Sequence, residues 1–167
     1  LLDTLDHPNK ADHDDSIALN FGVKATDADG DTDVSVLTVN VKDDGVDAVN
    51  DANAFGNSVG HVDGNVLTND YRGQDLPSRV TKVEFGGTSV TVPATGDVTI
   101  AGQYGTLKIN ANGTYTYTVA DPNRTGDAQD QFVYTLTDAD GDSDKATLTL
   151  KSLDDDTVPV ITPPQAK

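Results

Sequence analysis

The chain has 167 residues, of which 28 are Asp or Glu and only 11 are Lys or Arg, so its formal net charge is −17. This negative charge argues against nucleic acids and anionic lipid surfaces as partners, because both would repel it. The chain has no cysteine, which excludes disulfide bridges and thiolate metal sites. No stretch approaches 18 apolar residues, so no membrane insertion is expected. Nearly all of the acids are Asp and they cluster in turns, which is typical of a chain whose charge is partly neutralised by divalent cations.

Two β-patterned runs, residues 17–23 and 36–41, lie on either side of the acidic turn 26–31 (Thr-Asp-Ala-Asp-Gly-Asp). Apolar and polar side chains alternate along both runs, as in strands with one buried face. Two strands alone are marginal in water, so this face must be covered. Either an upstream part of the same repeat or another segment or chain could cover it. We interpret residues 1–44 as the C-terminal part of a preceding β-sandwich repeat.

Residues 45–52 are interpreted as a short acidic calcium-binding linker, and residues 53–153 as a complete repeat with frequent turn signals and no helical periodicity. The expected strands span residues 62–67, 79–85, 88–92, 98–101, 105–109, 114–119, 131–137 and 146–151. A tight hairpin is expected around Gly113, which can adopt a positive φ. Short strands at this spacing predict an all-β, Greek-key β-sandwich of the Ig-like kind. Residues 154–167 are interpreted as an acidic, Pro-rich linker.

The acidic turn occurs twice. Residues 137–142 repeat the sequence Thr-Asp-Ala-Asp-Gly-Asp of residues 26–31 after 111 positions, and the acids that follow each second strand repeat at the same offset. The second copy again lies between β-patterned runs, residues 132–136 and 146–150. The chain therefore contains one internal repeat of about a hundred residues, present once completely and once in part.

Three segments resemble a known family. Residues 105–117 (Gly-Thr-Leu-Lys-Ile-Asn-Ala-Asn-Gly-Thr-Tyr-Thr-Tyr), residues 64–70 (Gly-Asn-Val-Leu-Thr-Asn-Asp) and the run from Phe132 to Leu150 are similar to VCBS and cadherin-like bacterial repeats. The resemblance implies an Ig-like or cadherin-like β-sandwich from a large, type I-secreted, RTX-type adhesin on a bacterial surface. In that family such domains form long stalks stiffened by calcium. The glycine-rich nonapeptides of the secretion module do not occur in this chain.

The repeated turn is a candidate Ca²⁺ site, because alternate Asp residues in a tight turn can direct several carboxylates at one point and Ca²⁺ takes six to eight oxygen ligands. It is not an EF-hand, since Gly is fourth rather than sixth. The alternative is a solvated turn that is rich in Asp and Gly for conformational reasons. Strand alternation predicts that the second turn lies beside the acidic connector and the end of the 62–67 strand. The candidate metal ligands are Asp27, Asp29, Asp31, Asp43, Asp44, Asp70, Asp138, Asp140 and Asp142.

A second acidic group, which includes Asp121, Asp127, Asp130 and residues 154–156, is expected at the opposite end, either as a half-site for the next repeat or as plain polar loops. Tyr115, Tyr117 and Tyr134 occupy alternating strand positions and are expected in the core, whereas Tyr71 and Tyr104 could face a ligand. The three histidines are scattered, and His7 and His13, which lie in a polar loop, are expected to be solvated.

These observations favour a non-catalytic extender repeat of a calcium-rigidified surface adhesin, with neighbouring repeats as its partners and with host or surface glycans or peptides bound through other domains. A ligand-binding module for a glycan or peptide is the first alternative. A further alternative is that residues 1–44 are the returning half of a repeat split by an inserted ligand-binding domain. A hydrolase is not favoured, because neither a phosphate-binding loop nor a nucleophile elbow is present.

Overall fold

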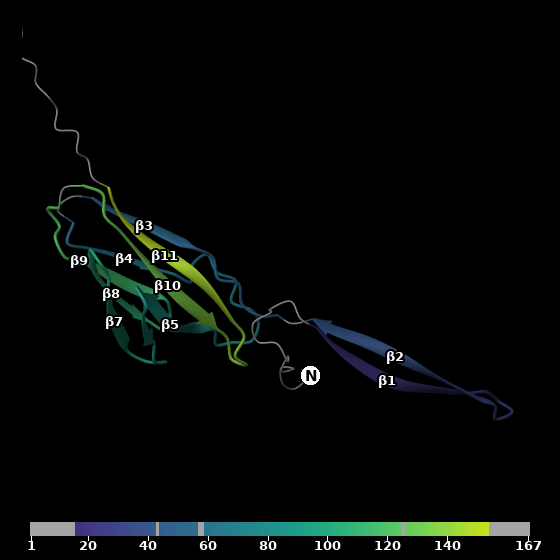
Figure 1. Cartoon of the computed structure of the whole chain (residues 1–167). Coiled ribbons are helices and arrows are strands. Elements are labelled where there is room, and N and C mark those ends of the chain that lie inside the picture. The colour runs from purple at the N-terminus through teal and green to yellow at the C-terminus, as the bar shows by residue number, and fades with distance from the viewer. Residues whose placement is uncertain (1–15, 43, 57–58, 125, 154–167) are drawn as a thin grey trace, which may run out of the picture.

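The computed structural model describes residues 16–42, 44–56, 59–124 and 126–153. These residues form strands in three sheets (Figure 1). The strands are β1 (Ser16–Thr26), β2 (Thr32–Lys42), β3 (Asp51–Gly56), β4 (His61–Asn65), β5 (Arg79–Phe85), β6 (Thr88–Thr91), β7 (Asp97–Ala101), β8 (Gly105–Asn110), β9 (Thr114–Val119), β10 (Gln129–Thr137) and β11 (Ser143–Leu153). Within the described residues, no helix is found that could cross a bilayer.

Two of the sheets form a β-sandwich. One has the order β3-β11-β10-β5-β6 and the other the order β4-β9-β8-β7. All neighbouring strands are antiparallel except β3, which pairs in parallel with β11. Because consecutive residues of a strand point to opposite faces, alternate residues of each sheet meet in the core. The prediction of an all-β sandwich is therefore confirmed.

The sandwich core contains the side chains that the alternating pattern predicts. Tyr117, Phe132 and Tyr134 are at most 1% exposed, and Leu107 and Leu148 are equally buried. The Tyr117 ring bridges the two sheets, with its centroid 6.1 Å from Phe132 and 5.7 Å from Phe55, and within the five-stranded sheet Phe132 lies 4.9 Å from Phe85. The turn between β8 and β9 has Gly113 at a φ of +83°, as expected for this tight hairpin.

The sandwich begins earlier in the chain than the sequence pattern indicates. Val46 is buried in the core, Asp47 pairs with Tyr71 through two backbone hydrogen bonds of 2.9 Å, and β3 begins at Asp51. Most of the stretch interpreted as a linker at residues 45–52 thus packs against the sandwich. The pattern missed β3 because Asp51-Ala52-Asn53-Ala54 has little β propensity and gains its order from pairing with β11.

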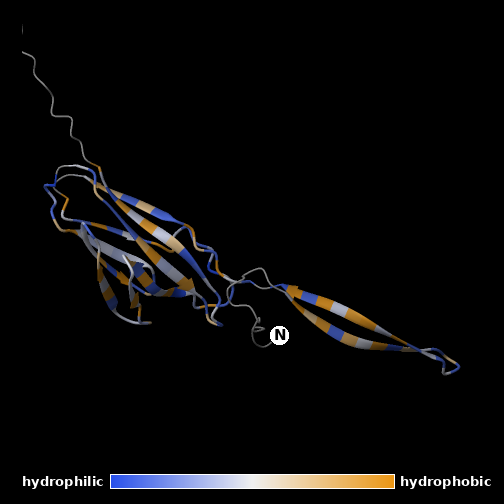
Figure 2. Cartoon of the chain, in the orientation of Figure 1, coloured by the Kyte–Doolittle hydropathy of each residue, from blue (hydrophilic) through white to orange (hydrophobic). Residues whose placement is uncertain are grey.

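The strands β1 and β2 form a two-stranded hairpin that projects away from the sandwich (Figure 1). Its register matches that of β10 and β11: Phe21 faces Leu37 as Phe132 faces Leu148, both shifted by 111 positions. Orange and blue residues alternate along both strands in Figure 2. The hairpin is therefore a structural copy of the last two strands of the sandwich.

Candidate metal centre

The turn between β10 and β11 directs three aspartates at one point. Asp138 organises it: its backbone N–H donates to the Asp142 carbonyl at 3.1 Å, and its Oδ1 accepts from the N–H groups of Gly141 and Asp142 at 3.0 and 2.8 Å. Gly141 has a φ of +106°, which a residue with a side chain rarely adopts. With the backbone closed in this way, Asp138, Asp140 and Asp142 each present a carboxylate oxygen, and these oxygens lie within 4.8 Å of one another.

This triad is largely removed from water. Asp138 is 7% exposed and Asp142 is 2% exposed. Burial, followed by the hydrogen bond and negative charge of Asp140, raises the pKa of Asp138 to about 6, although the N–H groups of Gly141 and Asp142 act in the opposite direction. A carboxyl group with a raised pKa is one whose negative charge is poorly compensated by the protein. The turn therefore favours a proton or a cation beside Asp138.

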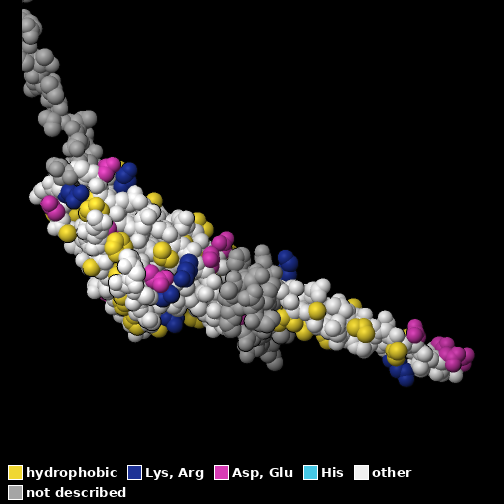
Figure 3. Space-filling model, in the orientation of Figure 1, with side chains coloured by type: hydrophobic (Ala, Val, Ile, Leu, Met, Phe, Trp, Pro, Cys, Tyr) yellow, Lys and Arg dark blue, Asp and Glu magenta, His cyan; other side chains and the backbone are white. Residues whose placement is uncertain are grey.

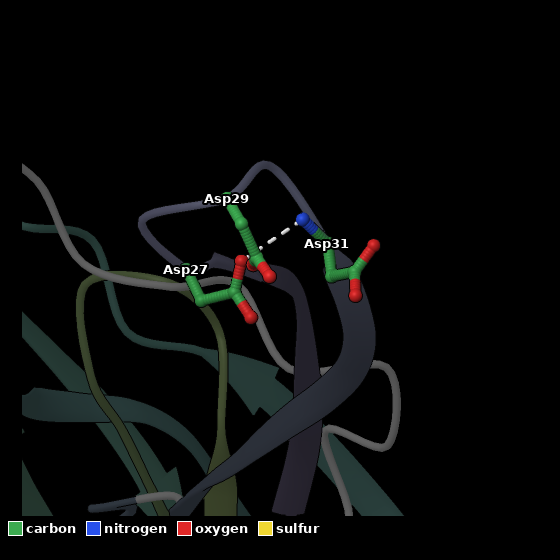
Figure 4. Close-up of side chains that lie close together, drawn as sticks. All are labelled: Asp27, Asp29 and Asp31. Atoms are coloured by element: carbon green, nitrogen blue, oxygen red, sulfur yellow. Dashed lines mark hydrogen bonds between the residues drawn. The ribbon is translucent and has the colours of Figure 1, made fainter.

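The turn between β1 and β2 has the same backbone but a different environment. Asp27 Oδ1 accepts from the N–H groups of Gly30 and Asp31 at 3.1 and 2.9 Å, and the carboxylates of Asp27, Asp29 and Asp31 cluster (Figure 4). All three residues are exposed at the tip of the hairpin, where Figure 3 shows acidic side chains gathered. A hydrogen bond with the Asp29 side chain, together with the backbone donors, lowers the pKa of Asp27.

The buried triad fits a calcium ion. Calcium–oxygen distances are about 2.3–2.6 Å, so oxygens on opposite sides of the ion lie roughly 5 Å apart, close to the spread of the three carboxylates. Among the described residues, no hydrogen bond reaches the buried Asp138 Oδ2. Oxygen ligands of this kind suit hard divalent cations rather than softer metals. Asp138, Asp140 and Asp142 are thus the residues that would hold Ca²⁺.

Two other predicted ligands, Asp44 and Asp70, lie at the same end of the sandwich but outside this triad. Asp44 Oδ1 accepts a hydrogen bond of 2.7 Å from the Tyr71 hydroxyl, and Asp70 Oδ1 accepts one of 2.8 Å from the Val49 N–H. The Ala139 N–H of the turn donates to the Asp75 carbonyl at 3.1 Å, which joins the turn to the loop that carries Asp70. Asp43 lies outside the described residues.

The predicted ligand Asp70 belongs to a second group of carboxylates, whose other member, Asp51, sequence reasoning missed. The Tyr134 hydroxyl lies 3.1 Å from Asp51 Oδ2 and 3.0 Å from both carboxylate oxygens of Asp70. Burial raises the pKa of Asp51 to about 6, and burial also raises that of Asp70, with the charges of Asp47 and Asp144 adding to the effect. Asp51 gave no motif signal, because it stands alone in a stretch interpreted as linker.

The acidic group expected at the opposite end contains one buried aspartate and two exposed ones among the described residues. Asp130 is buried and serves the fold: its carboxylate accepts from the N–H groups of Gln103 and Tyr104 at 3.0 Å and from the Tyr117 hydroxyl at 2.7 Å. It is therefore structural, which corrects its assignment to a half-site for the next repeat or to a polar loop. Asp121 and Asp127 are exposed, and residues 154–156 lie outside the described residues.

A cavity of about 190 Å³ lies at this opposite end, lined by Phe55, Tyr104, Pro122 and Arg124 among others. The Arg124 guanidinium stacks 4.5 Å from the centroid of the Tyr104 ring. Tyr115, Tyr117 and Tyr134 are buried as expected, whereas Tyr71 is 51% exposed.

Comparison with known proteins agrees with this architecture. Residues 42–151 match the family model described as "Bacterial Ig domain". The chain is also 33% identical over 136 residues to a protein of Rhizobium johnstonii named "Calcium-binding lectin RapA2", an alignment that covers 76% of this chain and 56% of that relative. The chain thus spans little more than half the length of this relative. The region that matches the family model contains β3 to β10 and β11 up to residue 151, and the chain belongs to the bacterial Ig domain family as an adhesin-type repeat.

Proposed function

We propose that this chain is a non-catalytic, calcium-binding extender repeat of a large bacterial cell-surface adhesin. The observation that supports the proposal is the buried triad Asp138, Asp140 and Asp142, whose oxygens lie within 4.8 Å of one another in a chain of net charge −17. The bacterial Ig fold and the similarity to a relative named as a calcium-binding lectin agree with it.

The position of the triad suggests what the ion does. The triad lies at the end of the sandwich where the chain enters from the hairpin. A hydrogen bond of 2.9 Å from the Ala48 N–H to Asp144 Oδ2 joins the entering segment to the residue that follows the triad closely in the sequence. Without a cation, the carboxylates at this point repel one another, and this repulsion weakens the packing of the segment that connects the hairpin to the sandwich. A bound Ca²⁺ replaces that repulsion with attraction and stiffens the junction between neighbouring repeats. Export by type I secretion, a place in an RTX-type adhesin and a role in biofilm formation belong to the same proposal.

The test is a calcium titration of the thermal unfolding of the whole chain. Extracellular modules bind Ca²⁺ with a Kd of about 10⁻⁴–10⁻³ M, so 10 mM Ca²⁺ is expected to add roughly 1.4–2.7 kcal/mol. For a domain of this size such a gain corresponds to about 5–20 °C in Tm. Mg²⁺ at the same concentration serves as the matched control and is expected to add much less, because it demands a smaller and more rigid octahedral site. No response to 10 mM Ca²⁺ would rule the proposal out.

A second candidate function is glycan binding at the cavity beside Tyr104. The observation that favours it is the combination of an aromatic ring, an arginine and an acidic side chain, Asp121, around one cavity, in a chain similar to a protein named as a lectin. It predicts binding on a glycan array that is lost in Tyr104→Ala and retained in Tyr71→Ala. Equal loss in both variants, or no glycan bound, would count against it.

A further inference from the structure

The hairpin of β1 and β2 has one apolar face, formed by Ile17, Leu19, Phe21, Val23, Leu37, Val39 and Val41, which we call the hairpin face. The two strands contribute to it in register, with Ile17 opposite Val41, Leu19 opposite Val39 and Phe21 opposite Leu37. Phe21 is 51% exposed and Leu37 55% exposed, and each strand of the hairpin pairs only with the other among the described strands. Such a contiguous apolar patch is unusual on a soluble protein and marks a surface that is normally covered.

The structure itself contains the covered form of this surface. The residues equivalent to Phe21 and Leu37 are Phe132 and Leu148, which pair in the same register and are 0% and 1% exposed. They are covered by the sheet β4-β9-β8-β7, and the free edges of their strands are occupied by β3, in parallel, and by β5, antiparallel. The apolar residues of the hairpin face are therefore expected to be covered in the same way, by a second sheet and by flanking strands.

The opposite face of the hairpin agrees with this equivalence. It carries Asn20 and Thr38, whose side chains share a hydrogen bond of 2.7 Å. The equivalent residues in the sandwich, Gln131 and Thr149, lie on the outer face of the five-stranded sheet. This face also carries Val34 and Val36, which are 73% and 64% exposed and correspond to Lys145 and Thr147, so it is mixed in character, whereas the hairpin face is apolar along most of its length.

Two observations indicate where the cover lies. In the complete repeat, β3 to β9 precede β10 in the chain, so the strands that match the hairpin precede β1. The sequence before β1 has a similar short run, because Pro8-Asn9-Lys10 resembles Pro122-Asn123-Arg124 before β10, at an offset of 114 positions that is three longer than the repeat. A second copy of this chain is a poor partner, since its own sandwich is already closed by its β10 and β11.

We infer that the hairpin face closes the core of a second β-sandwich, whose remaining strands, equivalent to β3 to β9, lie in the polypeptide on the N-terminal side of β1. This inference does not depend on calcium. With a repeat of 111 residues and a core that starts at Val46, about 70 further residues before residue 1 would supply the counterparts of β3 to β8.

The test compares the 167-residue chain with a chain extended by about 70 native residues before residue 1, both at the same calcium concentration. Hydrogen exchange is measured over residues 16–42. We expect exchange of these amides to slow at least tenfold in the extended chain, because β1 and β2 gain paired neighbours and a covered face.

Variants show whether the hairpin face is responsible. In the extended chain, Phe21→Ser is expected to abolish the added protection, and the milder Phe21→Leu to reduce it. The melting transition of the β3–β11 sandwich should remain unchanged in both. Val36→Ser, on the opposite face, is the matched control and should leave the protection in place.

Three results would overturn the inference. The first is equal exchange of residues 16–42 in the two chains. The second is protection in the 167-residue chain that rises with protein concentration, which would make a second copy the partner. The third is a Val36→Ser variant as damaging as Phe21→Ser.

Discussion

Replacing Asp138 by Asn is expected to stabilise the metal-free protein and to remove most of its response to calcium. The amide oxygen of Asn can still accept the two N–H groups of Gly141 and Asp142, which hold the turn at 3.0 and 2.8 Å. The buried Oδ2 becomes an NH₂ group, so the local negative charge disappears while the shape is kept. The variant therefore separates the role of Asp138 in folding the turn from its role in binding a cation.

The size of the effect follows from the pKa of Asp138, which is raised from 3.8 to about 6. A carboxyl group whose pKa is higher in the folded state favours folding when protonated, and this contribution is lost as the pH rises from 3.8 to 6. At 1.36 kcal/mol per pKa unit, ionisation of Asp138 costs the metal-free sandwich up to about 3 kcal/mol above pH 6. Because Asn cannot ionise, Asp138→Asn should regain about 1–3 kcal/mol at pH 7.5 in a chelator.

The assay is urea unfolding between pH 4 and 7.5, with chelator or with 10 mM Ca²⁺. In chelator the parent protein should lose stability as the pH rises through this range, and Asp138→Asn should lose less. With 10 mM Ca²⁺ at pH 7.5 the difference between the two proteins should shift toward the parent by roughly 1.4–2.7 kcal/mol, because only the parent retains the full charge at the site. Asp27→Asn is the matched control in the exposed copy of the turn and should leave the sandwich transition unchanged. The reasoning fails if Asp138→Asn destabilises the metal-free protein at pH 7.5, or if Ca²⁺ stabilises both proteins equally.

Two further substitutions test how the carboxylates and the sheets are held. Tyr134→Phe removes the hydroxyl between Asp51 and Asp70 and should lower the free energy of unfolding at pH 7.5 by roughly 1–3 kcal/mol, with a smaller loss at pH 5, where Asp51 is protonated. Gly105→Ala would place a Cβ 2.5 Å from the backbone carbonyl oxygen of Thr118 and should cost at least 1–3 kcal/mol in urea unfolding.

The sequence was sufficient for the sandwich because its strands carry their own pattern. Alternation along residues 105–119 identifies Leu107, Ile109, Tyr115 and Tyr117 as inward-facing, and all four are buried. β3 escaped detection, since alternation of Ala and Asn carries little β propensity and its strand form depends on β11, which lies about a hundred residues further along the chain. Local pattern predicts local structure well, but not a strand that is fixed by a distant partner.

In the candidate site, too, the sequence identifies the residues of a local motif but not the carboxylates that the fold brings together. The motif located the three aspartates of each turn, whose geometry is set within six residues by the hydrogen bonds of Asp138 or Asp27. It could not locate Asp51, which shares the Tyr134 hydroxyl with Asp70, or the burial of Asp130 under the 102–104 turn. Pairings of this kind depend on which loops the fold brings to one end.

The two copies of the turn show that the motif determines the arrangement of the carboxylate oxygens, whereas the surrounding fold determines their pKa values. Both have an aspartate that accepts two backbone N–H groups at 2.8–3.1 Å, so the motif alone sets the arrangement of the oxygens. The pKa of Asp27 is nevertheless lowered while that of Asp138 is raised, because only the second turn is packed against a sandwich. If the hairpin face closes a second sandwich, the turn at Asp27 should acquire the same burial and the same raised pKa. An NMR titration of Asp27 in the extended chain, with Asp138 as the internal reference, would then show the two carboxyl groups converging, whereas an unchanged low pKa at Asp27 would mean that its turn remains in water.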